Sequence, residues 1–543
     1  MSTSLRHRIG LVYLPGSLPC FEDFGNLPTD IVCSDGLVDG KPASEVLDMI
    51  IIPGGSLVES KSVNKKVAEE ILKMAEHGKF ILGICSGFQI LAKETDIGRL
   101  STVPITREGL GLLNVDFKPL ICTDRVTATT TDKSFITDKV GTTVSGFHCH
   151  TYGKIELHKD AKTILVSHAK KVNYFEPPQD LISGVANKQG NVVGIFIHGL
   201  LDRNPSIIES ITKSLNITST ELEEVRSANA KLLARMKSEV GVATNTHQQP
   251  LTSQKQTRLL LITATSSGTG KTFLVTGIAG ALKKRGYKVG VLKVGGDIRD
   301  VVPALYLTKE AMREYSSIRV WESGWSEAAD AVTEASREYD FLLVEGAMNA
   351  FTGLLMDDVR RPSSTAEVAA ALEASTVVVA SCNEEGVEGG IINTLNHVNL
   401  LKSLEIKAIG VILNKNPLSY LTENINQTMK QAFENAGVEL LGVVPRIDVQ
   451  GRGMIPEIEI KYEEFGAQAI DAAEKYLNLD NLVRIADSPK LVAVDYMAFV
   501  EKFKKLVINY TLNAFENREG ASSSNSRSNE QMNTDSNLQK EKT

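Results

Sequence analysis

The chain alternates short apolar, β-branched runs with longer stretches of helical character, and it does so in two separate blocks. Continuous apolar runs of this kind are typical of parallel strands that crossover helices bury on both faces. The pattern therefore predicts an α/β fold class with two doubly wound parallel-sheet domains. The expected strands are residues 9–13, 49–52 and 80–84 in the first block and 259–263, 341–344, 376–380 and 408–413 in the second.

A helix-like segment and a polar stretch rich in Thr, Gln and Ser separate the two blocks, and such a stretch is typical of a linker. At the other end, the sequence after residue 518 has almost no apolar side chains that could offset the entropy of ordering. Five segments follow from this. They are a first domain over 1–217, a helix and polar linker over 218–256, a second domain over 257–480, a helical extension over 481–517 and a disordered tail over 518–543.

Composition and charge narrow the class of protein. The chain has 543 residues, 42% hydrophobic and 23% charged, which suits a folded protein with more than one core. Its 59 basic and 66 acidic side chains give a net charge of −7 and no broad cationic field, so we expect neither nucleic acid nor membrane as a partner. Six sparse cysteines and the lack of a signal-like or membrane-spanning run favour a cytoplasmic protein, and a homo-oligomer is compatible with this composition.

One cysteine lies in a segment typical of a nucleophile elbow, FILGICSGFQIL over residues 80–91. Gly83 and Gly87 let a strand and a helix approach closely, so that the thiol of Cys85 stands exposed on the turn between them. The helix N-terminus favours a thiolate, and its free amides face an oxyanion. The alternative is a buried structural cysteine, which is the commoner fate of a lone cysteine.

Two further segments supply what a cysteine nucleophile needs. The strand at 50–52 ends in Gly54 and Gly55, whose amides can face a tetrahedral oxyanion. His198 ends another apolar strand, where it can serve as the base. Together the motifs PGG, GICSGFQIL and GIFIHGLLD resemble a class I glutamine amidotransferase domain of the cobyric acid synthase type, over about residues 8–215.

The resemblance implies a flavodoxin-type domain that releases ammonia from glutamine through a glutamyl thioester. It implies that Cys85 is the nucleophile and His198 the base, that the amides of Gly55 and Ser86 hold the oxyanion, and that Gln89 lies beside the substrate.

The sequence departs from the family where a third catalytic residue is expected. Leu200 stands two residues beyond His198, in place of the familiar triad acid, and Asp202 is only a weak candidate to replace it. Nearby, His148 and His150 alternate on a predicted strand and could form a metal pair. Two histidines without a third ligand are more often structural or solvent-facing.

The second block opens with a phosphate-binding loop. An apolar strand at 259–263 is followed at once by ATSSGTGKT and a helical pattern over 273–285, which is the order of a P-loop, although Thr265 replaces its first glycine. Inward-pointing amides and the helix N-terminus suit phosphate, while lysine reaches the β- and γ-phosphates and threonine can bind Mg²⁺. The predicted ATP-binding residues are Ser267, Gly268, Thr269, Gly270, Lys271 and Thr272.

A carboxylate for Mg²⁺ is expected at the end of a central strand. Glu345 follows four apolar residues at 341–344, and acids in such buried positions usually pair with something. Two more acids, Asp297 and Asp300, follow Lys293 in KVGGDIRD, which alone would indicate a solvated loop.

These segments resemble the amidoligase domain of cobyrinic acid a,c-diamide synthase and its dethiobiotin-synthetase-like relatives, over about residues 257–460. The resemblance implies that ATP phosphorylates a substrate carboxylate and that ammonia displaces phosphate to form an amide. It implies Lys271 at the phosphates, metal ligation by Thr272, Glu345 and Asp297, and substrate binding by Asp300.

Three departures from the family bear on these expectations. The domains stand in inverted order, with the glutaminase first. Ile298 and Arg299 replace a Tyr-Ile-like pair, and Thr352 replaces an acid of the FDG motif, both where substrate would be recognised. The sequence therefore predicts a glutamine-hydrolysing, ATP-dependent carbon–nitrogen ligase acting on a corrinoid precursor. The alternatives are an amidoligase for cobyric acid formation, a nickel tetrapyrrole or a cell-wall carboxylate, or a ParA/MinD-like switch ATPase.

Overall fold

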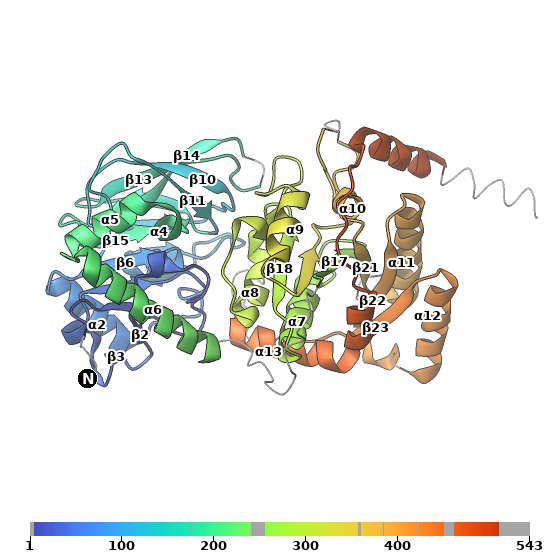
Figure 1. Ribbon diagram of the computed structural model, residues 1–543, viewed down its shortest axis with the longest axis horizontal. Helices are drawn as coiled ribbons and strands as arrows, with labels where there is room; N and C mark the ends of the chain where they lie inside the picture. Colours follow the sequence, from blue (N-terminus) through green and yellow to red (C-terminus); the bar gives the residue numbers. More distant parts are fainter. Residues whose placement is uncertain are drawn as a thin grey trace, which may run out of the picture.

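The computed structural model describes residues 5–174, 176–239, 256–356, 360–383, 385–420, 422–449 and 461–509. Two α/β units lie side by side along its long axis, and the first half of the chain forms one and the second half the other (Figure 1). The α/β fold class expected from the alternating pattern is confirmed. Of the predicted helix and polar linker over 218–256, residues 240–255 lie outside the described residues, and the predicted tail at 518–543 lies wholly outside them.

The first unit is built on a ten-stranded sheet of order β16-β11-β10-β13-β14-β15-β6-β5-β1-β2. Its parallel half consists of β1 (Ile9–Val12), β2 (Asp30–Val32), β5 (Met49–Ile52), β6 (Phe80–Ile84) and β15 (Val192–Ile195). Its antiparallel half consists of β10 (Arg125–Thr130), β11 (Thr143–His148), β13 (Lys162–Ala169), β14 (Gln179–Ala186) and β16 (Ile197–His198).

This antiparallel half differs from the predicted all-parallel sheet. Along β10 exposed and buried residues alternate strictly, which is typical of an antiparallel strand with one solvent face. A smaller sheet packs beside it, made of β7 (Glu94–Asp96), β8 (Thr106–Glu108), β9 (Val115–Lys118) and β12 (Lys154–Leu157), and β3 (Leu37–Val38) pairs with β4 (Lys41–Pro42). The helices are α1 (Ala43–Val46), α2 (Lys65–Glu76), α3 (Ser86–Leu91), α4 (Leu200–Arg203), α5 (Pro205–Ser214), α6 (Ser219–Glu239) and the short η1 (Phe24–Asn26).

Helix α6 belongs to the core of the first unit. Its residues Val225, Leu232 and Met236 are buried there, and their spacing places them on one face of the helix. The sequence placed this helix in a connecting segment with the polar linker. The structure instead joins α6 to the first unit, because these apolar side chains pack into the core of that unit.

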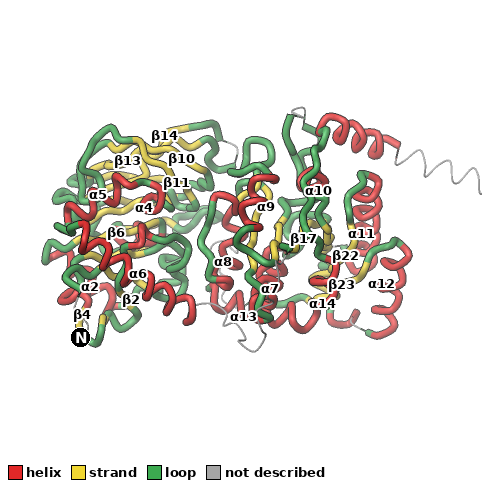
Figure 2. The backbone as a smooth tube through the Cα atoms, in the orientation of Figure 1, coloured by secondary structure: helices red, strands yellow, loops and turns green. Residues whose placement is uncertain are grey.

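The second unit is an all-parallel sheet of order β19-β18-β20-β17-β21-β22-β23, with helices on both faces (Figure 2). Its strands are β17 (Arg258–Ala264), β18 (Val289–Val294), β19 (Ser317–Ile318), β20 (Phe341–Glu345), β21 (Ser375–Ser381), β22 (Ala408–Asn416) and β23 (Glu439–Pro445). Its helices are α7 (Lys271–Lys284), α8 (Val302–Thr308), α9 (Ala328–Ser336), α10 (Thr365–Ala371), α11 (Gly386–Ser403), α12 (Glu423–Asn435), α13 (Tyr462–Tyr476) and α14 (Leu479–Ile485), with short turns η2 (Ile298–Val301), η3 (Glu314–Ser316) and η4 (Leu418–Tyr420).

The predicted C-terminal helical extension appears as α14 and a further helix over 496–509. Phe499, Val500 and Phe503 of that helix are buried in the second unit. Within the part of the chain that the structure describes, no helix is both long and apolar enough to cross a membrane.

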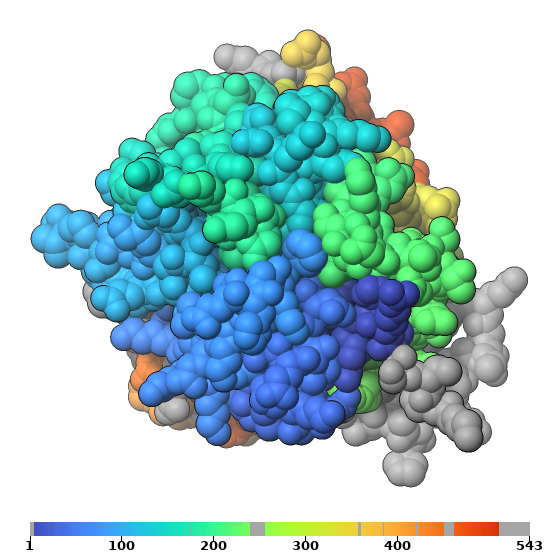
Figure 3. Space-filling model, turned by 90° about the vertical axis from the view of Figure 1, so that its left-hand side faces the viewer, coloured from blue at the N-terminus to red at the C-terminus, as the bar shows by residue number. Residues whose placement is uncertain are grey.

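The two units pack against each other through apolar and charged contacts. Leu18, Phe21 and Phe147 of the first unit join a core cluster of the second, and the ring of Phe147 lies 4.9 Å from that of Trp325. At the edge of this contact the guanidinium of Arg313 lies 2.8 Å from the carboxylate of Asp23. Seen from the side of the first unit, the second lies behind it and shows only beyond its edge (Figure 3).

Candidate active site

Cys85 lies on the sharp turn between β6 and α3, as its motif predicts. Its backbone has φ 52° and ψ −107°, a conformation that costs a non-glycine residue about 1–3 kcal/mol and persists only when its surroundings hold it. The amide of Cys85 donates to the carbonyl of Ile195 at 2.8 Å. Glycine is required on either side, because a Cβ on Gly87 would lie 2.1 Å from the carbonyl oxygen of Ile52 and one on Gly83 would lie 2.5 Å from that of Gly87.

The thiol of Cys85 is buried rather than exposed. Burial, with Cys149 nearby, raises its pKa well above the ordinary value, and its sulfur contacts the carbonyl oxygen of Cys149 at 3.5 Å. The expectation of an exposed thiol that the helix N-terminus keeps as a thiolate is therefore wrong for this closed arrangement. Desolvation outweighs the dipole of a helix of only six residues, so the sulfur needs a base to become nucleophilic.

His198 is oriented by Glu22, a residue that the sequence analysis did not identify. Nδ1 of His198 lies 2.6 Å from Oε1 of Glu22, and Oε2 of Glu22 accepts from the amide of Gly199 at 2.7 Å. Both side chains are only 3% exposed. Glu22 lies in the connection between β1 and β2, about 180 residues before the histidine, where no local motif indicates it.

Asp202, the acid proposed from its position near His198, lies elsewhere. Its carboxylate accepts from the amides of Asp23 and Gly25 at 3.1 and 2.7 Å, and burial raises its pKa to about 6. These two bonds hold the turn that follows Glu22, and neither of them involves the imidazole of His198. The His198 ring is packed instead between Phe147, stacked at 5.3 Å, and Phe21, edge-on at 5.1 Å.

The predicted oxyanion and glutamine-binding residues gather around the thiol. Gly55 has φ 136°, and a Cβ there would lie 2.1 Å from the carbonyl oxygen of Gly16, so only glycine fits. The thiol, Gly55, Gln89 and His198 line a small cavity of about 70 Å³, and Ser86 follows the thiol at the start of α3. The second unit closes this cavity with Arg299, Val302, Pro303 and Tyr462.

The two neighbouring histidines gain a third candidate ligand in the structure. Cys122, His148 and His150 are all buried, and their ligand atoms lie within 4.8 Å of one another. Nδ1 of His148 lies 2.5 Å from Nε2 of His150, while the outer nitrogens of the pair reach the hydroxyl of Ser167 at 3.0 Å and the carbonyl of Leu120 at 3.3 Å. Burial lowers the pKa of His150 to about 3 and that of His148 well below its ordinary value. Two neutral imidazole rings in a complete hydrogen-bonded chain favour a structural role for His148 and His150 over metal binding.

The phosphate-binding loop connects β17 to α7, as its motif predicts. Gly268 and Gly270 have φ 74° and 87°, the left-handed conformation that turns backbone amides inward. From β22, Asn414 and Lys415 donate to the carbonyls of Thr269 and Gly268 at 2.8 and 2.7 Å and fix the loop from outside.

Lys271 begins α7 at the mouth of this loop. Its ammonium donates to the carbonyl of Met348 at 2.8 Å, and burial together with the charge of Lys293 lowers its pKa to about 8. A buried cation whose charge is only partly compensated suits an incoming phosphate group.

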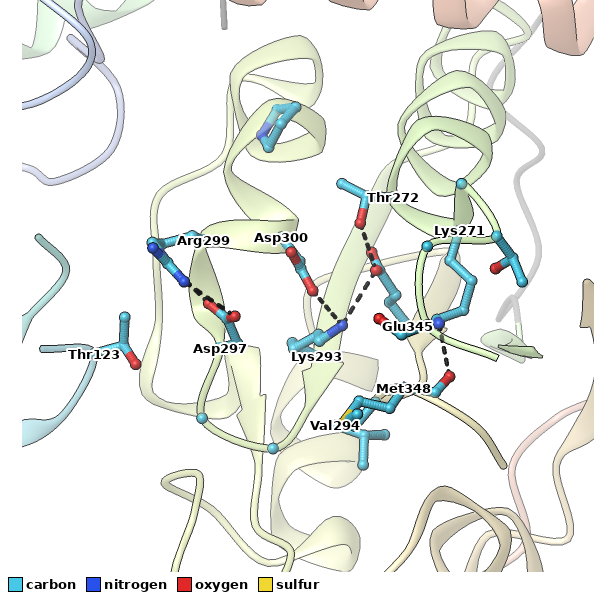
Figure 4. Close-up of a pocket in the computed structure, with 18 of the residues that line it drawn as sticks. Thr123, Lys271, Thr272, Lys293, Val294, Asp297, Arg299, Asp300, Glu345 and Met348 are labelled. Atoms are coloured by element: carbon cyan, nitrogen blue, oxygen red, sulfur yellow. Dashed lines mark hydrogen bonds and ion pairs between the residues drawn. The ribbon is translucent and has the colours of Figure 1, made fainter. Parts of the chain in front are cut away.

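Thr272 and Glu345, the predicted Mg²⁺ ligands, are in contact (Figure 4). The hydroxyl of Thr272 donates to Oε1 of Glu345 at 2.8 Å, and Lys293 lies 3.2 Å from the same oxygen. Oε2 of Glu345 is buried and accepts no hydrogen bond from any residue that the structure describes. Burial raises the pKa of Glu345 despite Lys293, so a hard cation fits this donor set well.

The two acids after β18 take different positions. The carboxylate of Asp300 lies 2.6 Å from the ammonium of Lys293, which links it to Glu345. Asp297, predicted as a metal ligand, pairs instead with the guanidinium of Arg299 at 3.0 Å, and this charge holds its pKa below the ordinary value although burial acts in the opposite direction. By its contacts Asp300 is the acid nearer to the Glu345 cluster.

The phosphate-binding loop and the charged groups Lys293, Asp297, Asp300 and Glu345 line a cavity of about 600 Å³ that both units enclose. Thr123, Asp124, Lys170, Lys171 and Tyr174 of the first unit form part of its wall. Arg299 and Pro303 line both this cavity and the small cavity at the thiol.

Comparisons with known proteins match both halves of the chain. Residues 36–206 match the CobB/CobQ-like glutamine amidotransferase domain, and residues 260–452 match the CobQ/CobB/MinD/ParA nucleotide binding domain. The fold and the two cavities thus define a fusion of an amidotransferase domain with a P-loop nucleotide-binding domain, in that order. The two domain models, in this order, support the cobyrinic acid a,c-diamide synthase and cobyric acid synthase family for this chain.

Several curated relatives carry these names. The cobyric acid synthase of Clostridium tetani is 29% identical over 240 residues, 42% of this chain and 45% of the relative. The cobyrinate a,c-diamide synthases of Listeria monocytogenes and Methanocaldococcus jannaschii are also 29% identical, over 47% and 46% of this chain and 56% of each relative. The chain spans about half the length of the curated relatives it matches. Among solved structures, the MinD cell division protein of Aquifex aeolicus is 16% identical over 46% of this chain and 96% of its own, with a TM-score of 0.26.

Proposed function

We propose that the protein is an ATP-dependent, glutamine-hydrolysing amidoligase that converts carboxylates of a corrinoid precursor into amides. The observation that carries the proposal is the common wall of the two cavities: Arg299 and Pro303 line both the cavity at the thiol of Cys85 and the cavity at the phosphate-binding loop. Ammonia released at the thiol would pass these two residues to reach the second cavity. The names of the curated relatives support a corrinoid acid as the substrate.

In the proposed first half-reaction, His198 takes the proton of the Cys85 thiol and the sulfur attacks the side-chain amide carbon of glutamine. The amides of Gly55 and Ser86 stabilise the oxyanion. As the carbon–nitrogen bond breaks, His198 returns the proton to the nitrogen, which leaves as ammonia. Water then hydrolyses the glutamyl thioester to glutamate and regenerates the thiol. Because Glu22 accepts from Nδ1 of the histidine, Nε2 is the nitrogen left free to accept the thiol proton.

In the proposed second half-reaction, an oxygen of the substrate carboxylate attacks the γ-phosphorus of ATP and ADP leaves, which gives an acyl phosphate. Ammonia attacks the acyl carbon, and phosphate leaves as the amide forms and one proton is released. Lys271 stabilises the charge of the transferring phosphoryl group from the phosphate-binding loop. Thr272 and Glu345 would hold Mg²⁺, which supplies charge neutralisation on the phosphates when bound.

The direct test supplies purified protein with Mg-ATP, glutamine and one candidate acid at a time, and follows product mass, ADP and glutamate. We expect a corrinoid acid to gain one amide for each ADP formed. Nickel tetrapyrrole and cell-wall carboxylates are the comparison substrates, and amidation of one of them instead would overturn the corrinoid assignment while keeping the reaction class. ATP hydrolysis that no acid stimulates would favour a switch ATPase of the ParA/MinD kind.

Two variants separate the half-reactions. Cys85→Ala is expected to lose glutamine-dependent amidation and to keep ammonium-dependent amidation, because the second cavity needs only the nitrogen. Lys271→Ala is expected to lose both, since it removes the cation at the phosphates. Equal loss of both activities in Cys85→Ala, or ammonium-driven turnover in Lys271→Ala, would contradict the division of labour.

A further inference from the structure

Arg299 occupies the wall between the thiol cavity and the phosphate cavity. It lies in η2, in the connection between β18 and α8, and Pro303 lies in the first turn of α8. Figure 4 shows Arg299 and Asp297 on the side of the larger cavity that faces Thr123 of the first unit, with Lys271 on the opposite side. The side chain of Arg299 is only 11% exposed, so it fills the wall instead of extending into solvent.

Groups from both units hold this guanidinium. Asp297 of the second unit binds it at 3.0 Å, while Nη1 donates to the hydroxyl of Thr151 at 3.4 Å and Nη2 donates to the hydroxyl of Tyr174, both from the first unit. Tyr174 has φ 70°, and the residue before it, Asn173, has φ 48°. Two successive left-handed residues hold the phenol against the guanidinium, and bonds of 2.9 Å between Asn173 and Ile121 fix that turn.

The charge of Arg299 makes the wall responsive to anions. A guanidinium stays protonated, and here Asp297 is its one carboxylate partner among the described residues, so a second anion in the larger cavity competes for it. The bonds to Thr151 and Tyr174 are to neutral hydroxyls and are weaker than an ionic contact with a phosphate or acyl phosphate. The same positive charge repels ammonium from the wall but not neutral ammonia.

We propose that Arg299 couples the two sites by closing the wall between them until an anionic intermediate forms in the larger cavity. The acyl phosphate draws the guanidinium away from Thr151 and Tyr174, which opens a passage from the thiol of Cys85 for ammonia. Arg299 thus contacts the acyl phosphate in the larger cavity, but it forms no covalent bond and transfers no proton in either half-reaction. The inference rests on the proposed function.

The test measures how many glutamates are released for each amide formed. The wild type is expected to release about one. In Arg299→Ala the wall stays open, ammonia escapes, and glutamine-dependent amidation falls about tenfold relative to glutamate release as the effective concentration of ammonia drops. Because Arg299 also lines the larger cavity, ammonium-dependent amidation by the same variant is the reference rate, and we expect the glutamine-dependent rate to fall about tenfold further than this reference. Tyr174→Phe, which removes only the phenolic acceptor, is expected to uncouple partially.

Arg125→Ala is the matched control. Arg125 also pairs across the two units, with Glu314, but lines neither cavity, so its loss should leave the ratio near one. A ratio near one in Arg299→Ala, with ammonium-dependent amidation retained, would overturn the inference and leave the proposed function intact. A wild type that amidates no acid even with ammonium would instead overturn the proposed function. If Arg299→Ala does not fold, the test rests on Tyr174→Phe. A ratio of glutamate released to amide formed equal to that of the wild type would then refute the coupling role of Arg299.

Discussion

Replacing Glu22 by glutamine removes the negative charge from His198 while keeping the size of the side chain. The carboxylate makes a 2.6 Å contact with the imidazole, and both side chains are almost fully buried, so the contact is a charge-assisted hydrogen bond with little solvent screening. Such bonds contribute about 1.5–3 kcal/mol. A loss of about 2 kcal/mol in the transition state, where the imidazole becomes positively charged, lowers kcat for glutamine hydrolysis about thirtyfold.

The assay is glutamate release at saturating glutamine, together with ammonium-dependent amidation as an internal control. Glu22 does not line the thiol cavity, so KM for glutamine should stay nearly constant while kcat falls. Asp202→Asn is the competing variant, because it removes the acid that lies closest to His198 in sequence among the candidates. A kcat for Glu22→Gln within about threefold of the wild type, or a larger loss in Asp202→Asn, would refute the assignment of Glu22 as the orienting acid.

Two further predictions concern the second cavity and the first core. The pKa of Lys271, lowered to about 8 by burial and Lys293, implies that ADP affinity is full below pH 8 and falls up to tenfold per pH unit above it, because phosphate binds the protonated lysine. Calorimetric titration from pH 6.5 to 9.5 checks this, and a flat profile would contradict it. Leu232→Ala in α6 should lower the free energy of unfolding by about 2–4 kcal/mol, since it leaves a cavity in the first core. Thermal unfolding measures the loss, the exposed Lys231→Ala is the control, and equal melting temperatures would show that α6 is not part of that core.

The features that the sequence predicted best are those whose residues are contiguous. The elbow at Cys85 and the phosphate-binding loop at Lys271 are each a strand, a glycine turn and a helix, and local sterics and backbone hydrogen bonding determine such units. Strand ends were also informative, because His198 and Glu345 each follow an apolar run. Glu345 ends the parallel strand β20, where carboxyl ends meet at one edge of the sheet, whereas His198 lies in the short antiparallel strand β16.

Contacts between residues that lie far apart in the sequence could not be predicted from local motifs. Glu22 reaches His198 from a connection with no periodic pattern, and Arg299 meets Tyr174 only because the two units dock. Tyr462 and its neighbours of the second unit help to line the cavity at Cys85, and burial is the largest cause of the raised pKa of the thiol, so the local motif alone did not indicate the direction of that shift. A clue did exist for the antiparallel half of the first sheet, since the RVTATT segment of β10 alternates in polarity, a pattern typical of a half-exposed strand.

The aromatic packing around His198 bears on how the protein matures. Phe21 and Phe147 enclose the imidazole, and both belong to a core cluster that the later half of the chain completes. During translation the earlier half leaves the ribosome before those partners exist. We therefore expect a nascent chain to acquire the proposed glutaminase activity only once the second unit has folded onto the first.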